Sequence, residues 1–166
     1  MSRSPDVRLA DVDEAMLDQL MALAMTDASP DEVTPPLGSG PGWNAERIDW
    51  FHAYHRASSA GLDGAAQEKS WAVLCDGGAA GSIRLKRTGP ATAETGIWLG
   101  RSWRGSGIGK AALTLVLAEA RRAGLQRVTA TTTGANIGAQ RLLTAAGALL
   151  TFDDGGAVSA AVELPD

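Results

Sequence analysis

The sequence predicts an α/β protein with a mixed, mostly antiparallel sheet flanked by about four helices, in the order β-α-α-β-β-β-α-β-α-β-β. Alternating apolar residues mark short strands, and apolar residues at helical spacing mark the helices. Residues 91–133 read as strand, turn, helix and strand, a crossover unit that joins two parallel strands. The chain has no internal repeat and no linker, so we expect a single domain over residues 1–166.

The first part of the chain reads as a strand followed by two helices. Residues 7–9 show a short strand pattern, and apolar residues then recur at helical spacing over residues 13–25. Residues 26–42 hold four of the seven prolines and three glycines, which predicts a long loop. Asn44 is a residue type that often caps a helix, so we expect the second helix over residues 44–59.

The rest of the chain alternates between strands and helices, with glycines at the boundaries. The expected strands are 69–75, 79–87, 92–100, 126–133, 148–153 and 157–164, and the expected helices are 108–123 and 136–147. Asp76-Gly77-Gly78 separates the first two of these strands as a hairpin turn. Gly124 stands where a helix-capping glycine belongs, and Gly147 ends the last helix.

The overall composition limits the classes of function. A net charge of −4 argues against a nucleic-acid-binding surface and fits an enzyme acting on a small molecule. Cys75 is the only cysteine, which excludes an intramolecular disulfide and a zinc–thiolate site. The N-terminus does not resemble a signal peptide, and no apolar run approaches the ~20 residues that span a bilayer. We therefore expect a soluble cytoplasmic protein without a membrane partner.

The stretch "RGSGIGKAAL" (residues 104–113) places three glycines directly before a helix. A P-loop needs a glycine at Arg104 and a hydroxyl residue at Ala111, and the stretch has neither. A dinucleotide fingerprint needs a different glycine spacing and an acidic residue about 20 positions later, where "LQRV" stands. What remains is R-x-x-G-x-G, formed by Arg104, Gly107 and Gly109. Its backbone amides and the helix N-terminus favour a pyrophosphate, although such a turn can also bind nothing.

The wider pattern resembles the GNAT superfamily of acetyl-CoA-dependent N-acetyltransferases. "ETGIWLGRSWRGSGIGKAAL" resembles its strand and pyrophosphate loop, and "GLQRVTATTTGANIGAQRLLTAAGA" resembles the motif that follows. "AAGSIRL", with Gly81, resembles the preceding strand. The likeness covers most of residues 5–164, and the spelling "GIWLG" leans toward the branch that acetylates the N-termini of ribosomal proteins.

The resemblance implies roles for particular residues. Amides of the glycine turn would hold the pyrophosphate of coenzyme A, and the strand before it would pair with the pantetheine arm, with the Leu99 amide facing the thioester oxygen. Asn136 would contact the cofactor, act as a helix cap, or do both. The implied coenzyme A site comprises Ile97, Trp98, Leu99, Arg104, Gly105, Ser106, Gly107, Ile108, Gly109, Lys110 and Asn136. Glu94 is the candidate general base, with an exposed strand glutamate as the alternative.

The sequence also departs from the family pattern. Leu143 stands where the family often has a tyrosine acid, and the only tyrosine, Tyr54, lies in the second expected helix. The thiol of coenzyme A would then leave as a thiolate without that acid, since its pKa of about 8.5 makes this tolerable. Alternatively, the protein binds the cofactor and transfers poorly.

Three further sets of residues allow either a functional or a structural interpretation. His52 and His55 have helical spacing, but no third ligand is spaced with them, so we expect no metal. The aromatic residues Trp43, Trp50 and Phe51 either shape an acceptor pocket or belong to the core. Acidic residues in two loops either attract a cationic amine or are solvated turns; they are Asp27, Asp31, Glu32, Asp153 and Asp154.

The sequence thus predicts an N-acetyltransferase in which an amine attacks acetyl-CoA directly within a ternary complex. The expected partner is a small-molecule or peptide amine, with no nucleic acid. The rival hypotheses are an acyl-CoA-binding module with little catalysis and a nucleotide-binding domain. The acceptor amine and the oligomeric state stay open, a homodimer being one expectation.

Overall fold

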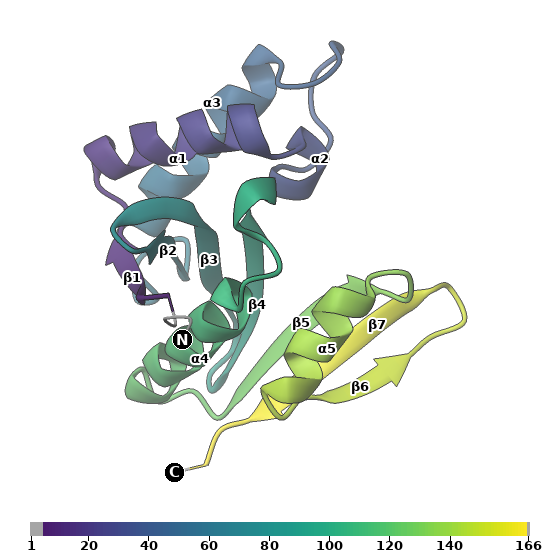
Figure 1. Cartoon of the computed structure of the whole chain (residues 1–166). Helices are drawn as coiled ribbons and strands as arrows, with labels where there is room; N and C mark the ends of the chain where they lie inside the picture. Colours follow the sequence, from purple (N-terminus) through teal and green to yellow (C-terminus); the bar gives the residue numbers. More distant parts are fainter. Residues whose placement is uncertain (1–4, 166) are drawn as a thin grey trace.

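The computed structural model describes residues 5–165 and contains one seven-stranded sheet in the order β1-β2-β3-β4-β5-β7-β6 (Figure 1). The strands are β1 (Val7–Asp11), β2 (Glu68–Cys75), β3 (Gly78–Gly89), β4 (Thr92–Leu99), β5 (Arg127–Thr133), β6 (Leu149–Phe152) and β7 (Ala157–Glu163). All neighbouring strands are antiparallel except β4 and β5, which are parallel. The mixed, mostly antiparallel sheet predicted from the sequence is confirmed.

The helices are α1 (Glu14–Asp27), α2 (Pro30–Val33), α3 (Ala45–Ser58), α4 (Ile108–Arg122) and α5 (Ile137–Ala145), with a short 3₁₀ turn at Arg101–Trp103. Every element expected from the sequence is present, with bounds that differ by at most two residues. The departure is α2, which interrupts the predicted loop. Pro30 occupies its first turn, and Ser29 and Glu32 form a capping box, so local capping makes one helical turn in a segment whose prolines predict a loop.

Two hydrophobic clusters hold the helices against opposite faces of the sheet. Helices α1 and α3 pack on one face through a cluster that includes Leu17, Leu20 and Phe51. Helix α4 packs on the other face around Ile83, Val116 and other buried residues. Figure 1 shows α5 lying along β5, β7 and β6. No helix within residues 5–165 combines the length and apolar character needed to cross a lipid bilayer.

The turn after α4 explains how the crossover returns to the sheet. Gly124 has φ +81°, a left-handed conformation that glycine adopts without a steric cost. Its amide donates to the Arg121 carbonyl (3.0 Å), and the Leu125 amide donates to the Ala120 carbonyl (3.0 Å). This pair of hydrogen bonds is a Schellman cap, with the buried Leu125 providing its hydrophobic contact. The glycine expected at the helix end therefore has that role.

The parallel contact between β4 and β5 is short. Only Thr92, Ala93 and Glu94 pair with β5, opposite residues 127–129. Beyond Glu94 the two strands diverge, as Figure 1 shows, while β4 remains paired with β3 as far as Leu99. One edge of the second half of β4 therefore has no neighbouring strand.

Helix α3 is anchored to β2 by a buried polar contact. His55 is 2% exposed and Ser70 is 3% exposed, and the ring Nδ1 lies 2.9 Å from the serine hydroxyl. The edge of the His55 ring also packs against Phe51, with ring centroids 4.6 Å apart. Burial, followed by the charge of His52, lowers the pKa of His55 to about 4. The ring is therefore neutral at neutral pH.

This buried ring predicts a specific loss of stability in acid. The histidine of the unfolded chain binds its proton near pH 6.5, whereas the folded one binds it only near pH 4. The unfolded state therefore takes up more protons between these values, and the free energy of unfolding falls as the pH falls. From this group alone we expect a loss of about 3 kcal/mol between pH 6.5 and pH 4. Urea unfolding at several pH values measures it.

The matched variants are His55→Gln and His52→Gln. We expect His55→Gln to lower stability at pH 7 but to flatten its pH dependence, because the titrating ring is gone. His52→Gln replaces the half-buried histidine one turn earlier, whose charge is the smaller cause of the shift, so we expect it to reduce the slope only slightly. Equal slopes in the wild type and His55→Gln would contradict this account.

Candidate functional site

Two cavities meet at the middle of β4. The larger, of about 490 Å³, lies between the sheet and α3 and is closed on one side by the segment that contains α2. The smaller, of about 250 Å³, lies between β4, β5 and α5. Both are lined by Ile83, Gly96 and Ile97. A molecule in each cavity would thus approach the other at Gly96 and Ile97.

The free edge of β4 faces the smaller cavity. The Gly100 amide donates to a carbonyl of β3 (2.9 Å), and the Ala91 carbonyl accepts the amide of Arg127, the first residue of β5 (3.3 Å). Backbone groups along a strand alternate between its two neighbours. The amides of Ile97 and Leu99 therefore point toward the diverging β5, where an extended ligand arm can pair with them as an added strand does.

Trp98 differs from Ile97 and Leu99 in both its backbone and its side chain. It pairs with Ser82 in the antiparallel ladder, so its backbone groups face β3 instead of the cleft. Its indole lies 6.3 Å from the Phe51 ring, among the residues of α1 and α3. The structure therefore places Trp98 in the wall of the larger cavity.

Gly81 explains how closely β3 and β4 approach at this point. A Cβ atom at Gly81 would lie 2.0 Å from the Trp98 carbonyl oxygen, closer than any real contact. Only glycine fits here, because any side chain would push the two strands apart.

The glycine turn leaves a run of backbone amides available at the N-terminus of α4. Gly105 and Gly107 have φ +80° and +84°, and Gly107 is the N-cap of the helix. The first hydrogen bond of the helix runs from the Ala111 amide to the Gly107 carbonyl (3.1 Å). Within the described residues, the amides of residues 105–110 have no protein acceptor. Together with the helix dipole, they form an anion-binding concavity that suits a pyrophosphate.

The side chains of the turn contribute less than its backbone. Ile108 is buried under the helix, and the Ser106 hydroxyl donates to the Trp103 carbonyl (3.3 Å). Gly109 lies where a Cβ atom would be 3.5 Å from Leu142 of α5, so the backbone approaches that helix closely. Lys110 is exposed on the first turn of α4 and makes no ion pair within the described residues.

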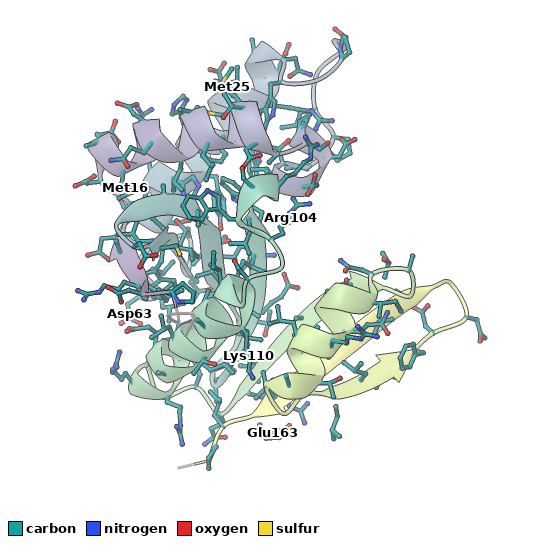
Figure 2. The ribbon with its side chains drawn as sticks, in the orientation of Figure 1. Met16, Met25, Asp63, Arg104, Lys110 and Glu163 are labelled. Carbon is teal, nitrogen blue, oxygen red and sulfur yellow. The ribbon has the colours of Figure 1, made fainter. Side chains whose placement is uncertain are left out.

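Arg104 contacts both the end of β4 and helix α2. Its Nε and Nη2 atoms donate to the Leu99 carbonyl at 3.1 and 3.0 Å, and its guanidinium also pairs with Glu32 of α2. Figure 2 shows the labelled Arg104 close to α2. Its side chain thus fixes the end of β4 to the wall of the larger cavity, so its place in the predicted cofactor site is that of a support. The Leu99 carbonyl is occupied, while the Leu99 amide is free.

Asn136 and Leu143 both belong to α5. The Asn136 Oδ1 atom accepts a hydrogen bond from the Ala139 amide (3.0 Å), which is the helix-cap role foreseen for it. Asn136 also lines the smaller cavity, so the cap and a contact with a ligand are compatible. Leu143 is 7% exposed and lines the same cavity with an apolar side chain.

The larger cavity has a floor of charged residues. Side chains of β2, β3 and β4 that face α3 form cross-strand rows, one of which is Glu68, Lys86 and Glu94. Glu94, the predicted base, has a side chain that is 39% exposed and pairs with Arg84 Nη2 at 2.8 Å. Arg84 also approaches Glu68, at 3.8 Å.

Gly96 makes room for the Arg84 guanidinium. A Cβ atom at Gly96 would lie 3.0 Å from Arg84 Nε and 3.1 Å from Nη2. The guanidinium therefore lies flat on the glycine backbone, at the place where the two cavities meet. This role of Arg84 was not predicted from the sequence, although "IRLKR" alternates and so puts Arg84 and Lys86 on the face opposite Ile83.

Tyr54 lines the larger cavity and donates its hydroxyl proton to Glu68 (2.7 Å). Burial, followed by this hydrogen bond, raises the pKa of Tyr54 well above its usual range. The hydroxyl therefore stays protonated. Trp50 stacks on Tyr54 at 5.0 Å between ring centroids, and Phe51 also contributes to the lining. Trp43 instead packs edge-on against Phe51 and belongs to the cluster of α1 and α3.

Three of the other acidic residues singled out in the loops have structural partners, whereas Asp154 makes no hydrogen bond or ion pair within the described residues. Asp27 accepts hydrogen bonds from the amide and hydroxyl of Ser102, which hold the pKa of its carboxyl below the usual range. Asp31 pairs with Arg47 (2.9 Å), and Asp153 caps the turn between β6 and β7. No group of three histidine, cysteine or acidic side chains in residues 5–165 is placed to hold a metal ion.

An open strand edge and an amide-rich helix N-terminus can together hold an extended ligand that carries a pyrophosphate. A family model of the acetyltransferase (GNAT) domain matches residues 7–149. The chain therefore belongs to the GNAT acetyltransferase family, and the resemblance seen in the sequence is confirmed. It is an acetyltransferase that uses acetyl-CoA as its co-substrate.

Solved structures support the same fold. The GNAT domain of S. lividans PAT is 20% identical with a TM-score of 0.71, over 96% of this chain and 90% of that one. RimL, a ribosomal L7/L12 alpha-N-protein acetyltransferase in complex with coenzyme A, is 19% identical with a TM-score of 0.71, over 95% and 94%. The yncA protein of Salmonella typhimurium, with its cofactor acetyl-CoA, is 16% identical with a TM-score of 0.67, over 99% and 96%. No curated protein matches the sequence.

The glycine turn predicts the effect of one substitution. We expect Gly107→Glu to abolish coenzyme A binding, because a carboxylate would occupy the anion-binding concavity. Titration calorimetry with coenzyme A measures the change.

Gly124→Glu is the matched control for this substitution. Gly124 has the same left-handed backbone (φ +81°) and lies at the opposite end of the same helix. The control introduces the same charge and the same backbone strain, and should bind coenzyme A as the wild type does. Unchanged affinity in Gly107→Glu would place the cofactor elsewhere.

Proposed function

We propose that the protein transfers an acetyl group from acetyl-CoA to a primary amine by direct attack within a ternary complex. The observation that carries this proposal is the meeting of two cavities at Gly96 and Ile97. One is lined by Leu142, which Gly109 of the glycine turn approaches, and the other is lined by Glu94. A donor and an acceptor held in separate cavities with one common boundary need no covalent enzyme intermediate.

The residues around the smaller cavity fit coenzyme A. The amides of residues 105–110 lack protein acceptors within the described chain, and those of Ile97 and Leu99 face the cleft. The first group would bind the pyrophosphate, the second would pair with the pantetheine arm, and Asn136 would contact that arm from α5. Bound acetyl-CoA supplies the activated acetyl group. The Leu99 amide would donate to its carbonyl oxygen and stabilise the negative charge that develops there.

Glu94 would act as the general base for the acceptor. One of its oxygens pairs with Arg84, and the other has no hydrogen-bond partner among the described residues. The free oxygen is available to accept a proton from the acceptor ammonium, directly or through water. Because Glu94 lies two residues before Gly96 on the same face of β4, it stands next to the boundary of the two cavities.

No tyrosine of the described chain stands on the cofactor side to protonate the leaving thiolate. Leu143 occupies the position where the family often has one, and Tyr54 lies in the larger cavity with its proton directed at Glu68. We therefore infer that the thiolate leaves without a tyrosine acid, which its moderate basicity allows.

An amine panel separates an enzyme from an acyl-CoA-binding module. We expect amine-stimulated release of free thiol from acetyl-CoA with at least one amine among amino acids, polyamines, aminoglycosides and peptides with free N-termini. Thiol detection measures the rate, and calorimetry measures coenzyme A binding in parallel. Tight binding without amine-stimulated release supports the binding module instead. Stabilisation by ATP or NAD in place of coenzyme A supports a nucleotide-binding domain.

The role of Glu94 predicts a change in the pH profile. We expect Glu94→Gln to lower kcat by about 10²–10⁴-fold and to remove the acidic limb of the kcat/KM profile, because the amide accepts no proton. Glu163→Gln is the control, since Glu163 pairs with Arg127 on β5, outside both cavities. An unaltered profile in Glu94→Gln would exclude Glu94 as the base.

A further inference from the structure

We propose that the acceptor is an amine that carries a carboxylate a few bonds away, as a free amino acid does, and that Lys86 binds this carboxylate. The inference rests on the proposed function, because it assigns a substrate class to the larger cavity. It comes from the pairing of charges on the floor of that cavity.

Nearly all charged side chains that line the cavity have a partner within the protein. Glu32 pairs with Arg104, and the guanidinium of Arg84 serves both Glu94 at 2.8 Å and Glu68 at 3.8 Å. Glu68 also accepts the Tyr54 hydroxyl. The neutral ring of His55 adds no charge.

Lys86 is the exception among the described residues. It lines the cavity and is exposed, and its ammonium makes neither an ion pair nor a hydrogen bond. Its cross-strand neighbours on both sides are acidic, Glu68 and Glu94, yet the ion pairs of these two carboxylates are with Arg84 from the next row, at 3.8 and 2.8 Å. Lys86 and Arg84 together balance the charges of Glu68 and Glu94, but the Lys86 ammonium alone has no bonded partner in the part of the chain that the structure describes, and it lies directly beside the predicted base.

The neighbouring side chains of Glu94 and Lys86 suit a ligand that carries both an ammonium and a carboxylate. Side chains that are direct cross-strand partners have Cβ atoms about 5 Å apart, so Glu94 and the stem of Lys86 are neighbours. An ammonium at the free oxygen of Glu94 leaves a carboxylate on the adjoining carbon within reach of the long Lys86 side chain. The lysine then holds the acceptor while its amine points toward the boundary with the smaller cavity.

Other amines fit this floor less well. A polyamine would bring its second ammonium toward Lys86 and Arg84, which repel it. The N-terminus of a peptide has a neutral amide where an amino acid has its carboxylate, so Lys86 gains no partner. The stacked rings of Trp50 and Tyr54 add an apolar wall that favours an acceptor with an apolar side chain.

The test compares three acceptors that differ only beyond the amine: a free amino acid, its carboxamide, and a tripeptide that begins with the same residue. Leucine, methionine, phenylalanine and tryptophan give four such sets. We expect kcat/KM for the free acid to exceed that for the carboxamide by about 10- to 100-fold, since one charge-assisted contact is lost. The carboxamide has the less basic amine, which by itself would favour it, so a preference for the acid is a stringent result.

Two lysine variants assign the preference to a residue. Lys86→Gln should bring the ratio of acid to carboxamide close to one without loss of folding, because Lys86 is exposed. Lys69→Gln is the matched control: Lys69 lies on β2, on the opposite face of the sheet, and pairs with Asp11 at 2.8 Å. The control should keep the wild-type ratio.

The possible failures are distinguishable. Equal or faster reaction of carboxamides or peptides overturns the inference and leaves the proposed acetyltransferase intact. A preference for the free acid that survives in Lys86→Gln also overturns it, because the carboxylate is then recognised elsewhere. Absence of thiol release with every amine, together with intact binding of coenzyme A, overturns both.

Discussion

The short pairing of β4 with β5 is the constraint on which the site depends. A continuous parallel ladder would satisfy every backbone group along the second half of β4. Since pairing ends at Glu94, the amides of Ile97 and Leu99 stay available, and a cavity forms in the space between the strands. The glycine turn follows β4 in the chain, and its Gly109 approaches Leu142, which lines that cavity. In the proposed function, donor binding therefore depends on sheet geometry more than on particular side chains.

The opposite face of the same strands has the charged and aromatic residues to which we assign the acceptor. Alternation along β3 and β4 puts apolar residues such as Ile83 toward α4 and charged residues such as Arg84 and Glu94 toward α3. In the proposed function, the sheet thus separates a cofactor side, built from backbone amides and apolar walls, from an acceptor side built from charges and aromatic rings. At Gly96 only the backbone of β4 separates the two cavities, because glycine has no side chain.

The features that the sequence predicts best are those formed by the local backbone. The glycine turn, the Schellman cap at Gly124 and the cap at Asn136 are local events, and short-range patterns predict them well. Trp98 was grouped with Ile97 and Leu99 because the register with β3, which turns its backbone away from the cleft, is a property of two strands together. The link from Arg84 to Glu94 depends on the same register and on the absence of a Cβ atom at Gly96.

The acceptor side was harder to predict for a related physical reason. Helix α2 forms in a proline-rich loop because Ser29 and Glu32 cap each other, and Glu32 is then placed to meet Arg104 from 72 residues further along the chain. Contacts between residues so far apart in sequence leave no periodic signal. Lys86 likewise becomes notable only when the partners of all its neighbours are known.

Arg104 has a consequence for how this scaffold can change its substrate. One guanidinium joins the Leu99 carbonyl, at the end of the donor strand, to Glu32, in the segment that closes the acceptor cavity. The loop over residues 26–42 is therefore not an independent module that can be exchanged freely between relatives. A transplanted loop without an acid at the position of Glu32 would leave Arg104 with the Leu99 carbonyl as its remaining partner. The end of β4, which we propose binds the donor, would then be held less firmly. A grafted loop that is meant to change the acceptor specificity therefore has to keep an acidic residue at the position of Glu32.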